Sequence, residues 1–233
     1  KFVKLAIIPA RGGSKRIPRK NIKEFCGKPM IAYSIEAALD SGCFDKVIVS
    51  TDDKEIATIA ELYGAEVPFV RPPEISDDYA TTIQVVAHAI RWCEAQNWPI
   101  EAVCCIYATA PFIDKDDLSL GYSKMVAERV EFVFSAALFP FAIQRAIELS
   151  AKGEVTMIQP GHAATRSQDL PEAYHDAGQF YWGQKTAFLD NKEIFAKHSR
   201  IVLLPRERVQ DIDTHEDWQF AETLYHAMNS RVN

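Results

Sequence analysis

Short apolar runs that alternate with helical patterns constrain the fold of this 233-residue chain more than any other feature. The runs at 4–10, 46–50 and 102–108 are mostly apolar, as strands are when helices cover both faces of their sheet. Between these runs, apolar residues recur at helical spacing. The alternation predicts an α/β fold with a mostly parallel, Rossmann-like sheet flanked by helices. The predicted helices are 30–42, 54–64, 82–96, 114–129 and one from about Thr214, and the later strands are 132–137, 178–183 and 200–205.

The alternation breaks between about 140 and 170. This stretch has a mixed composition and no clean period. We interpret it as an insertion within a single domain that spans 1–233. It could pack against a partner chain, or it could be a long surface excursion without a partner.

Charge and composition limit the partners of this chain. A net charge of −6 disfavours general binding to nucleic acid or to membranes. The longest apolar runs, such as 102–113, are too short to cross a membrane as a helix, and the start of the chain is a poor signal peptide. Five cysteines without metal-type spacing are typical of a reducing compartment, so we expect a cytoplasmic protein.

Six basic residues without an intervening acid follow the first predicted strand, within 11–23. The carboxyl ends of parallel strands form the ligand edge of such a sheet, so we expect this loop there. Its two glycines allow backbone amides to approach an anion closely. Arg11, Lys15 and Lys20 can supply full positive charges, and the set suits a triphosphate. The loop is neither a Walker loop nor a G-x-G-x-x-G turn, and a solvated basic loop is the alternative.

The same loop has the pattern A-R-x-x-S-K-x-x-x-x-K-N. It resembles the nucleotide-binding signature of the CMP-sugar-acid synthetases, the cytidylyltransferases that activate sialic acid and related nonulosonic acids. The resemblance implies an α/β fold of the nucleotidyltransferase type, a CTP site in this loop, and a homodimer built by the insertion. The CTP-binding candidates that it implies are Ala10, Arg11, Gly12, Ser14, Lys15, Lys20 and Asn21.

A proline-rich segment at 70–82 is similar to the part of the same family that faces the nucleoside. Arg71, Asp78 and Thr82 stand at the matching positions and are further nucleotide-binding candidates. On physical grounds, a proline-stiffened loop with arginine and hydroxyl groups can recognise the edge of a pyrimidine. An ordinary loop with a helix cap at Thr81 or Thr82 is the alternative.

Two aspartates near the C-terminus, Asp211 and Asp213, form a candidate metal site. In a strand, the side chains of residues i and i+2 point to the same side. Two carboxylates so placed suit Mg²⁺, which keeps several waters and bridges to phosphates. The family that the chain resembles has the same D-I-D-T sequence and uses it for metal. The alternative is a strand end followed by a helix cap.

Two segments, 106–114 and 173–183, depart from the sialic acid enzymes of the family and indicate a different sugar acid. The string HDAGQFYW in the second segment resembles the subfamily that acts on pseudaminic acid, a bacterial nine-carbon sugar acid. Arg166 could pair with the substrate carboxylate, and the family's insertion can donate residues across the dimer. Each candidate could instead be an ordinary strand or surface residue. The implied substrate-binding candidates are Tyr107, Thr109, Arg166, His175, Asp176, Gln179 and Tyr181.

The resemblance implies a nucleotidyl transfer that serves bacterial surface glycans or flagellin. The anomeric hydroxyl of pseudaminic acid attacks the α-phosphorus of CTP, and pyrophosphate leaves. We expect Arg11, Lys15 and Lys20 to stabilise the transition state electrostatically, and Asp213 to act catalytically through Mg²⁺. Enzymes for sialic, legionaminic or 3-deoxy-octulosonic acid are alternatives within the class. A metal-dependent glycosyltransferase and a non-catalytic nucleotide-binding protein are alternatives from other classes.

Overall fold

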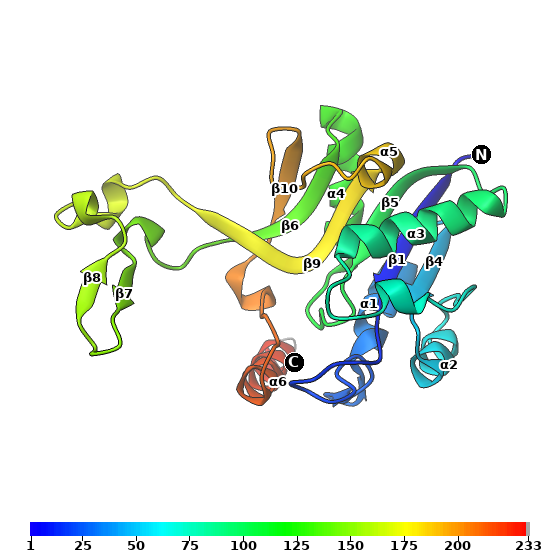
Figure 1. Ribbon diagram of the computed structural model, residues 1–233, viewed down its shortest axis with the longest axis horizontal. Coiled ribbons are helices and arrows are strands. Elements are labelled where there is room, and N and C mark those ends of the chain that lie inside the picture. The colour runs from blue at the N-terminus through cyan, green and yellow to red at the C-terminus, as the bar shows by residue number, and fades with distance from the viewer. Residues whose placement is uncertain (232–233) are drawn as a thin grey trace.

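The computed structural model describes residues 1–231, so the last two positions of the predicted domain at 1–233 lie outside the described residues (Figure 1). One sheet forms the centre of the fold, and helices flank it. Its strands are β1 (Val3–Pro9), β4 (Lys46–Ser50), β5 (Ile100–Ile106), β6 (Phe132–Leu138), β9 (Tyr174–Gln184) and β10 (Ser199–Leu203). The helices are α1 (Met30–Asp40), α2 (Lys54–Leu62), α3 (Thr82–Ala95), α4 (Lys115–Glu128), α5 (Lys185–Leu189) and α6 (His215–Ser230).

The strands follow the order β10-β6-β9-β5-β1-β4. β1 runs parallel to β4 and β5, and β6 runs parallel to β10. β9 runs antiparallel to both of its neighbours, β5 and β6, so the other five strands share one direction. The prediction of a mostly parallel sheet is therefore confirmed. The reversal of β9 could not be predicted from its apolar pattern, because that pattern reflects burial and not strand direction.

Helices cover both faces of the sheet. α1, α2 and α4 share a core cluster with Ala6 and Ile8 of β1 on one face. α3 and α5 share a second cluster with Leu5 and Ile7 on the other face. Burial on both faces explains why the centre of β1 is apolar at consecutive positions. Among residues 1–231, no helix is both long enough and apolar enough to span a membrane.

A third cluster joins the C-terminal helix to the basic loop. Ile17 and Phe25 from the loop region are buried in it together with Ile212 and Trp218 from around the start of α6. Two short strands, β2 (Glu24–Phe25) and β3 (Lys28–Pro29), pair as a hairpin in this region. α6 therefore lies beside the loop that follows β1, although the two stand at opposite ends of the sequence (Figure 1).

The predicted insertion leaves the sheet after β6 and returns at β9 (Figure 1). We call residues 139–173 the arm. It contains a small hairpin of β7 (Ile147–Leu149) and β8 (Val155–Met157), and it extends away from the sheet. Large apolar side chains of the arm are exposed, Phe141 at 82 % and Leu149 at 67 %. Clusters of exposed apolar side chains are typical of protein interfaces.

Candidate active site

Acidic side chains at the end of β4 and the start of α2 hold the basic loop in place. The Gly12 amide donates a hydrogen bond to Asp52 Oδ1 at 3.0 Å. Arg19 donates to both carboxylate oxygens of Asp53, at 2.7 and 2.9 Å, and to Glu55 at 2.8 Å. Asp53 also caps the first turn of α2. These contacts fix the loop at the sheet edge where parallel strands end, as the sequence predicts.

Other basic residues of the loop also contact acids. Arg11 and Lys15 both pair with the carboxylate of Asp78, with Lys15 Nζ at 2.5 Å. These two cations, Lys15 first, hold the pKa of Asp78 at about 2. Arg16 lies 3.3 Å from Asp213. Carboxylates from other segments thus balance much of the positive charge of the loop.

A cavity of about 260 Å³ opens beside the loop. Its lining comes from the end of β1, the basic loop, the segment after β4, the start of α3 and the segment after β5. The structure thus brings together candidates that the sequence predicts from separate stretches. Eight of them line this cavity, namely Arg11, Ser14, Lys20, Asn21, Arg71, Thr82, Tyr107 and Thr109.

Four nucleotide-binding candidates lie just outside that lining. Ala10 is buried, and its amide donates to the Ser50 carbonyl at 2.9 Å. Gly12 faces the end of β4 through its bond to Asp52. Lys15 and Asp78 form their ion pair nearby, with the Lys15 side chain mostly exposed.

Arg71 is the buried cation of this cavity, and only 3 % of it is exposed. Its guanidinium donates to the backbone carbonyls of Ser50 and Ile75, at 3.0 and 3.2 Å. Its Nε has no hydrogen-bond partner within residues 1–231. Burial lowers the pKa of Arg71. Because carbonyls and not a carboxylate hold this side chain, its charge stays available to a ligand.

The start of α3 settles which threonine caps the helix. Thr81 accepts from the Gln84 amide and forms a capping box with it. Thr82, the next residue, lines the cavity. The helix cap and the predicted nucleotide contact therefore fall on different residues and do not compete.

Asp211 and Asp213 lie in an irregular segment just before α6. The prediction that they belong to a strand is wrong, because β10 ends at Leu203. Partial desolvation, followed by the neighbouring Asp213 carboxylate, raises the pKa of Asp211, whose side chain remains exposed. The cap of α6 holds this segment, because Asp217 accepts from the Asp213 amide at 2.9 Å.

Lys20 connects the basic loop to this carboxylate pair. Its Nζ donates to the Ile212 carbonyl at 2.6 Å and lies 3.9 Å from Asp213. Lys20 also lines the 260 Å³ cavity, so the carboxylate pair and the basic loop meet at one place. Asp211 and Asp213 do not line this cavity themselves, and Lys20 is the residue that links them to it.

The carboxylate pair has donor chemistry that suits Mg²⁺. In nucleotide sites this ion takes one or two carboxylates, and phosphate and water oxygens complete its shell. Among residues 1–231, no group of three or more histidine, cysteine and acidic side chains could hold a metal by itself. A metal at Asp211 and Asp213 would therefore take its other ligands from water and phosphate oxygens.

An adjoining cavity of about 400 Å³ shares Thr82 and Tyr107 with the first and is lined by two further candidates, Asp176 and Tyr181. The Tyr181 hydroxyl donates to the Asp176 carboxylate. The rings of Tyr107 and Tyr181 lie 5.2 Å apart. Burial, followed by Tyr107 and Asp176, raises the pKa of Tyr181 well above its usual value. The tyrosine is therefore a neutral donor beside a carboxylate.

The other substrate-side candidates are more scattered. His175 lines a third cavity, of about 520 Å³, which shares Asp176 with the cavity of about 400 Å³. Gln179 is buried, and its Nε2 donates to the Arg208 carbonyl at 2.6 Å. Arg166 lies on the arm and pairs with Asp169 at 3.0 Å, so this chain does not bring it to the cavity.

Several residues that build the site were not predicted from the sequence. Asp52, Asp53 and Glu55 position the basic loop, and Arg208 positions Gln179. The acidic run after β4 was a usable signal, because it ends a strand parallel to β1 and must lie at the same edge. Arg208 carried no such signal, since its contact depends on the tertiary fold.

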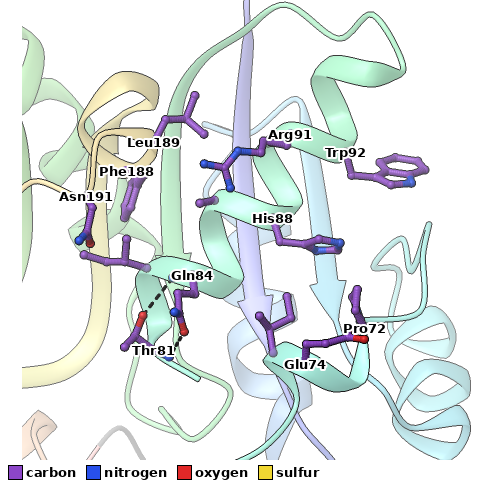
Figure 2. A pocket seen from close by; sticks show the side chains of 13 residues that line it. Pro72, Glu74, Thr81, Gln84, His88, Arg91, Trp92, Phe188, Leu189 and Asn191 are labelled. Carbon is purple, nitrogen blue, oxygen red and sulfur yellow. Dashed lines mark hydrogen bonds between the residues drawn. The ribbon is translucent and has the colours of Figure 1, made fainter. Parts of the chain in front are cut away.

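A larger cavity, of about 860 Å³, lies along the outer side of α3 (Figure 2). His88 and Arg91 of α3 face it, with Pro72 and Glu74 on one side and Leu189 and Asn191 on the other. It contains none of the predicted site residues. Chemistry therefore places the candidate active site in the smaller cavities beside the basic loop.

Comparison with known proteins gives the family. The family described as cytidylyltransferase matches residues 5–230. The chain belongs to the cytidylyltransferase family. Its membership confirms the resemblance seen in the basic loop and the predicted enzyme class, and it leaves the glycosyltransferase and non-catalytic alternatives without support.

Individual relatives refine the position of the chain within the family. A pseudaminic acid cytidylyltransferase of Campylobacter jejuni serotype O:2 is 52 % identical over 221 residues, which are 95 % of each chain. A CMP-N,N'-diacetyllegionaminic acid synthase of Legionella pneumophila is 31 % identical over 94 % of this chain and 95 % of its own. A solved CMP:2-keto-3-deoxy-manno-octonic acid synthetase complexed with CTP has a TM-score of 0.72 at 15 % identity, over 97 % of this chain and 99 % of that one. This last likeness shows a shared fold.

Proposed function

We propose that this cytidylyltransferase transfers CMP from CTP to the anomeric hydroxyl of pseudaminic acid and releases pyrophosphate. The observation that carries the proposal is the identity of 52 % along 95 % of a relative named for this activity, against 31 % for one named for a legionaminic acid derivative. The departures from the sialic acid pattern at 106–114 and 173–183 support the same substrate.

The nucleotide occupies the cavity beside the basic loop in this proposal. Arg71 and Thr82 face the nucleoside, and Asn21 helps to shape the loop, because its Nδ2 donates to the Arg11 carbonyl at 3.0 Å. Arg11, Lys15 and Lys20 contact the phosphates. As the α-phosphorus is attacked, negative charge builds up on its oxygens and on the leaving pyrophosphate, and positioned cations stabilise that charge. Holding both substrates in line supplies much of the remaining acceleration.

Asp211 and Asp213 are the residues that would hold Mg²⁺. When bound, the ion would neutralise charge on the phosphate oxygens. Lys20 has a separate task, because its Nζ bonds to the Ile212 carbonyl and so keeps the carboxylate segment next to the phosphates. Arg16, 3.3 Å from Asp213, adds positive charge at the same place.

The sugar acid occupies the adjoining cavity, where Tyr107, Asp176 and Tyr181 supply polar contacts. The cavity shares Tyr107 and Thr82 with the nucleotide cavity, so the two substrates would meet there. We further propose a homodimer formed through the arm, whose exposed apolar side chains require a partner surface. In such a dimer Arg166 could reach the sugar carboxylate of the other subunit. We expect the reaction to take place in the cytoplasm, because all five cysteines are free thiols.

Pyrophosphate release tests the proposed function. The purified chain is incubated with Mg²⁺, CTP and one sugar acid from a panel of pseudaminic, N,N'-diacetyllegionaminic and N-acetylneuraminic acid. We expect release with pseudaminic acid at a kcat/KM at least about tenfold above the others, because lost polar contacts in a pocket commonly cost that much. Preferential release with another acid of the panel would replace the proposed substrate but keep the reaction. No release with any of them would contradict the proposed reaction.

A further inference from the structure

Asp78 stands in an unexpected position for a nucleotide-binding residue. Its carboxylate bridges Arg11 and Lys15, the two cations predicted to contact the phosphates. A carboxylate and a triphosphate are both anionic, so they cannot occupy the same cations together without strong repulsion. If the phosphates bind where the sequence and the cavity indicate, Asp78 has to move away from at least one of these partners.

The segment around Asp78 is attached to the rest of the chain mainly by this ion pair. On its N-terminal side, Ser76 is fixed by its hydroxyl, which donates to the Pro72 carbonyl at 2.7 Å. On its C-terminal side, the capping box of α3 begins at Thr81. Between these two points, the Tyr79 and Ala80 amides donate to the carboxylate of Asp77, so these bonds stay within the segment. The contacts of Asp78 are the ones that reach the basic loop.

The ion pair of Asp78 is also exposed. Asp78 retains 39 % of its side-chain exposure, and Lys15 retains 79 %. Exposed ion pairs contribute little to stability, because water and salt screen them and long side chains lose entropy when they are held. A polyanion that offers several oxygen atoms to Arg11 and Lys15 can therefore displace one carboxylate at low cost.

We infer that Asp78 is a displaceable counter-ion that neutralises Arg11 and Lys15 in the free enzyme and is released when a polyphosphate binds. The role rests on the proposed function, because it takes the basic loop as the phosphate site. It differs from the role that the family resemblance implies, in which Asp78 contacts the nucleotide. Release of Asp78 frees the segment 77–80, so phosphate binding and the position of this segment are coupled.

Replacement of Asp78 by asparagine tests the inference. Asp78→Asn keeps the size of the side chain and removes its charge, so Arg11 and Lys15 lose their competitor. The probe is inorganic tripolyphosphate without divalent cations, which has no base or sugar for Asp78 to recognise. We expect Asp78→Asn to bind tripolyphosphate about threefold to fivefold more tightly than the parent chain in calorimetry, the upper part of the range that exposed ion pairs span.

Asp77→Asn is the matched control. Asp77 neighbours Asp78, and its substitution changes the net charge by the same amount, but within residues 1–231 its carboxylate contacts only local amides. Asparagine can keep those contacts through its own oxygen. We expect tripolyphosphate affinity of Asp77→Asn to stay within twofold of the parent. Equal tightening by both variants would show a general charge effect and would overturn the inference.

Two further outcomes separate this inference from the proposed function. Unchanged or weaker tripolyphosphate binding by a folded Asp78→Asn, checked by its thermal unfolding, would overturn the counter-ion role. Weaker binding of CTP with unchanged binding of tripolyphosphate would instead establish Asp78 as a contact to the nucleoside. Neither result depends on turnover, so a failure of the pseudaminic acid assay leaves this test intact.

Discussion

The nucleotide half and the sugar half of the candidate active site are built in different ways. The nucleotide half takes most of its residues from one loop at 10–21, whose charges pair with acids on neighbouring segments. The sugar half combines Tyr107, which follows β5, with Asp176 and Tyr181 of the antiparallel strand β9. The difference suggests that a single loop with cations and exposed amides can recognise phosphates, whereas a particular sugar requires a pocket built by tertiary packing.

We expect the largest effect for Asp213, a residue of the nucleotide half that does not come from the basic loop. Asp213 serves the nucleotide half but comes from the far end of the chain. We expect Asp213→Ala to lower kcat by about a thousandfold, because a metal held at phosphate oxygens contributes several kcal/mol to the transition state. Steady-state pyrophosphate release over a series of Mg²⁺ concentrations measures this effect.

Glu216→Gln provides the control for Asp213. Glu216 is exposed in the first turn of α6. Its replacement by glutamine removes one negative charge close to Asp213 in the sequence. We expect its turnover and its Mg²⁺ dependence to match the parent. Turnover of Asp213→Ala within tenfold of the parent would reject the metal assignment.

The second largest effect is expected for Gly12, whose substitution tests whether the nucleotide half depends on the position of the basic loop. A Cβ atom on Gly12 would lie 2.8 Å from Asp53 Oδ2, a contact that real side chains do not tolerate. We expect Gly12→Ala to weaken CTP binding by about tenfold to a hundredfold, because overpacking of this size commonly costs 1–3 kcal/mol and here displaces the loop. Calorimetric titration with CTP measures the change.

Gly13 is the matched control, because among residues 1–231 a Cβ atom there would come within 4 Å of Arg11 Nη1 alone, at 3.9 Å. We expect Gly13→Ala to bind CTP within about threefold of the parent chain, since it introduces the same methyl group without a clash. If the two variants lost affinity equally, flexibility of the loop and not its contact with Asp53 would be decisive.

The third effect concerns the sugar half alone. Tyr181→Phe removes the hydroxyl that donates to Asp176 and leaves the ring in place. We expect KM for the sugar acid to rise by about tenfold, because a hydrogen bond to a charged group contributes about 1.5–3 kcal/mol and its loss releases the exposed Asp176 carboxylate, while KM for CTP stays unchanged. Initial rates with each substrate varied in turn separate the two constants.

Tyr174→Phe is the comparison variant for Tyr181. Tyr174 also lies on β9 and donates its hydroxyl to a carboxylate, that of Glu172, but outside the cavity that holds Tyr181. We expect both KM values of this variant to match the parent. A rise in KM for CTP in Tyr181→Phe would break the division between the two halves.

The same division explains what could be predicted from the sequence. The central strands could be predicted because burial on both faces leaves an apolar run, and the basic loop because its charges are contiguous. The irregular segment of Asp211 and Asp213 was mistaken for a strand, since alternation alone does not show whether a neighbouring strand is present. The bond between Tyr181 and Asp176 joins two residues of β9 across the place where its pairing with β6 shifts register. Such contacts arise from packing and leave no local pattern.

The smallest expected effect concerns the anchor of the nucleotide half, the pair of Arg19 and Asp53. Arg19 is the main cause that lowers the pKa of Asp53 to about 2 in the folded chain, against about 3.9 in an unfolded chain. A lowered carboxyl pKa stabilises the fold above about pH 4, and this stabilisation is lost as the pH falls towards 2. We expect Arg19→Gln to reduce the free energy of unfolding at pH 7 by about 1 kcal/mol, because Arg19 is 38 % exposed and water screens part of the pair.

Denaturant unfolding at pH values from 7 to about 2.5 measures this contribution. The difference between the parent and Arg19→Gln should shrink as the pH falls below about 4, because protonation of Asp53 removes the pair from the parent as well. Arg166→Gln, which breaks the more exposed pair with Asp169 on the arm, should change stability by less than about 0.5 kcal/mol. A pH-independent difference for Arg19→Gln would mean that the side chain stabilises the loop through packing. Apolar contacts of Arg19, and not its ion pair with Asp53, would then hold the basic loop in place. The contrast between a nucleotide half held by charges and a sugar half formed by packing would have to be abandoned.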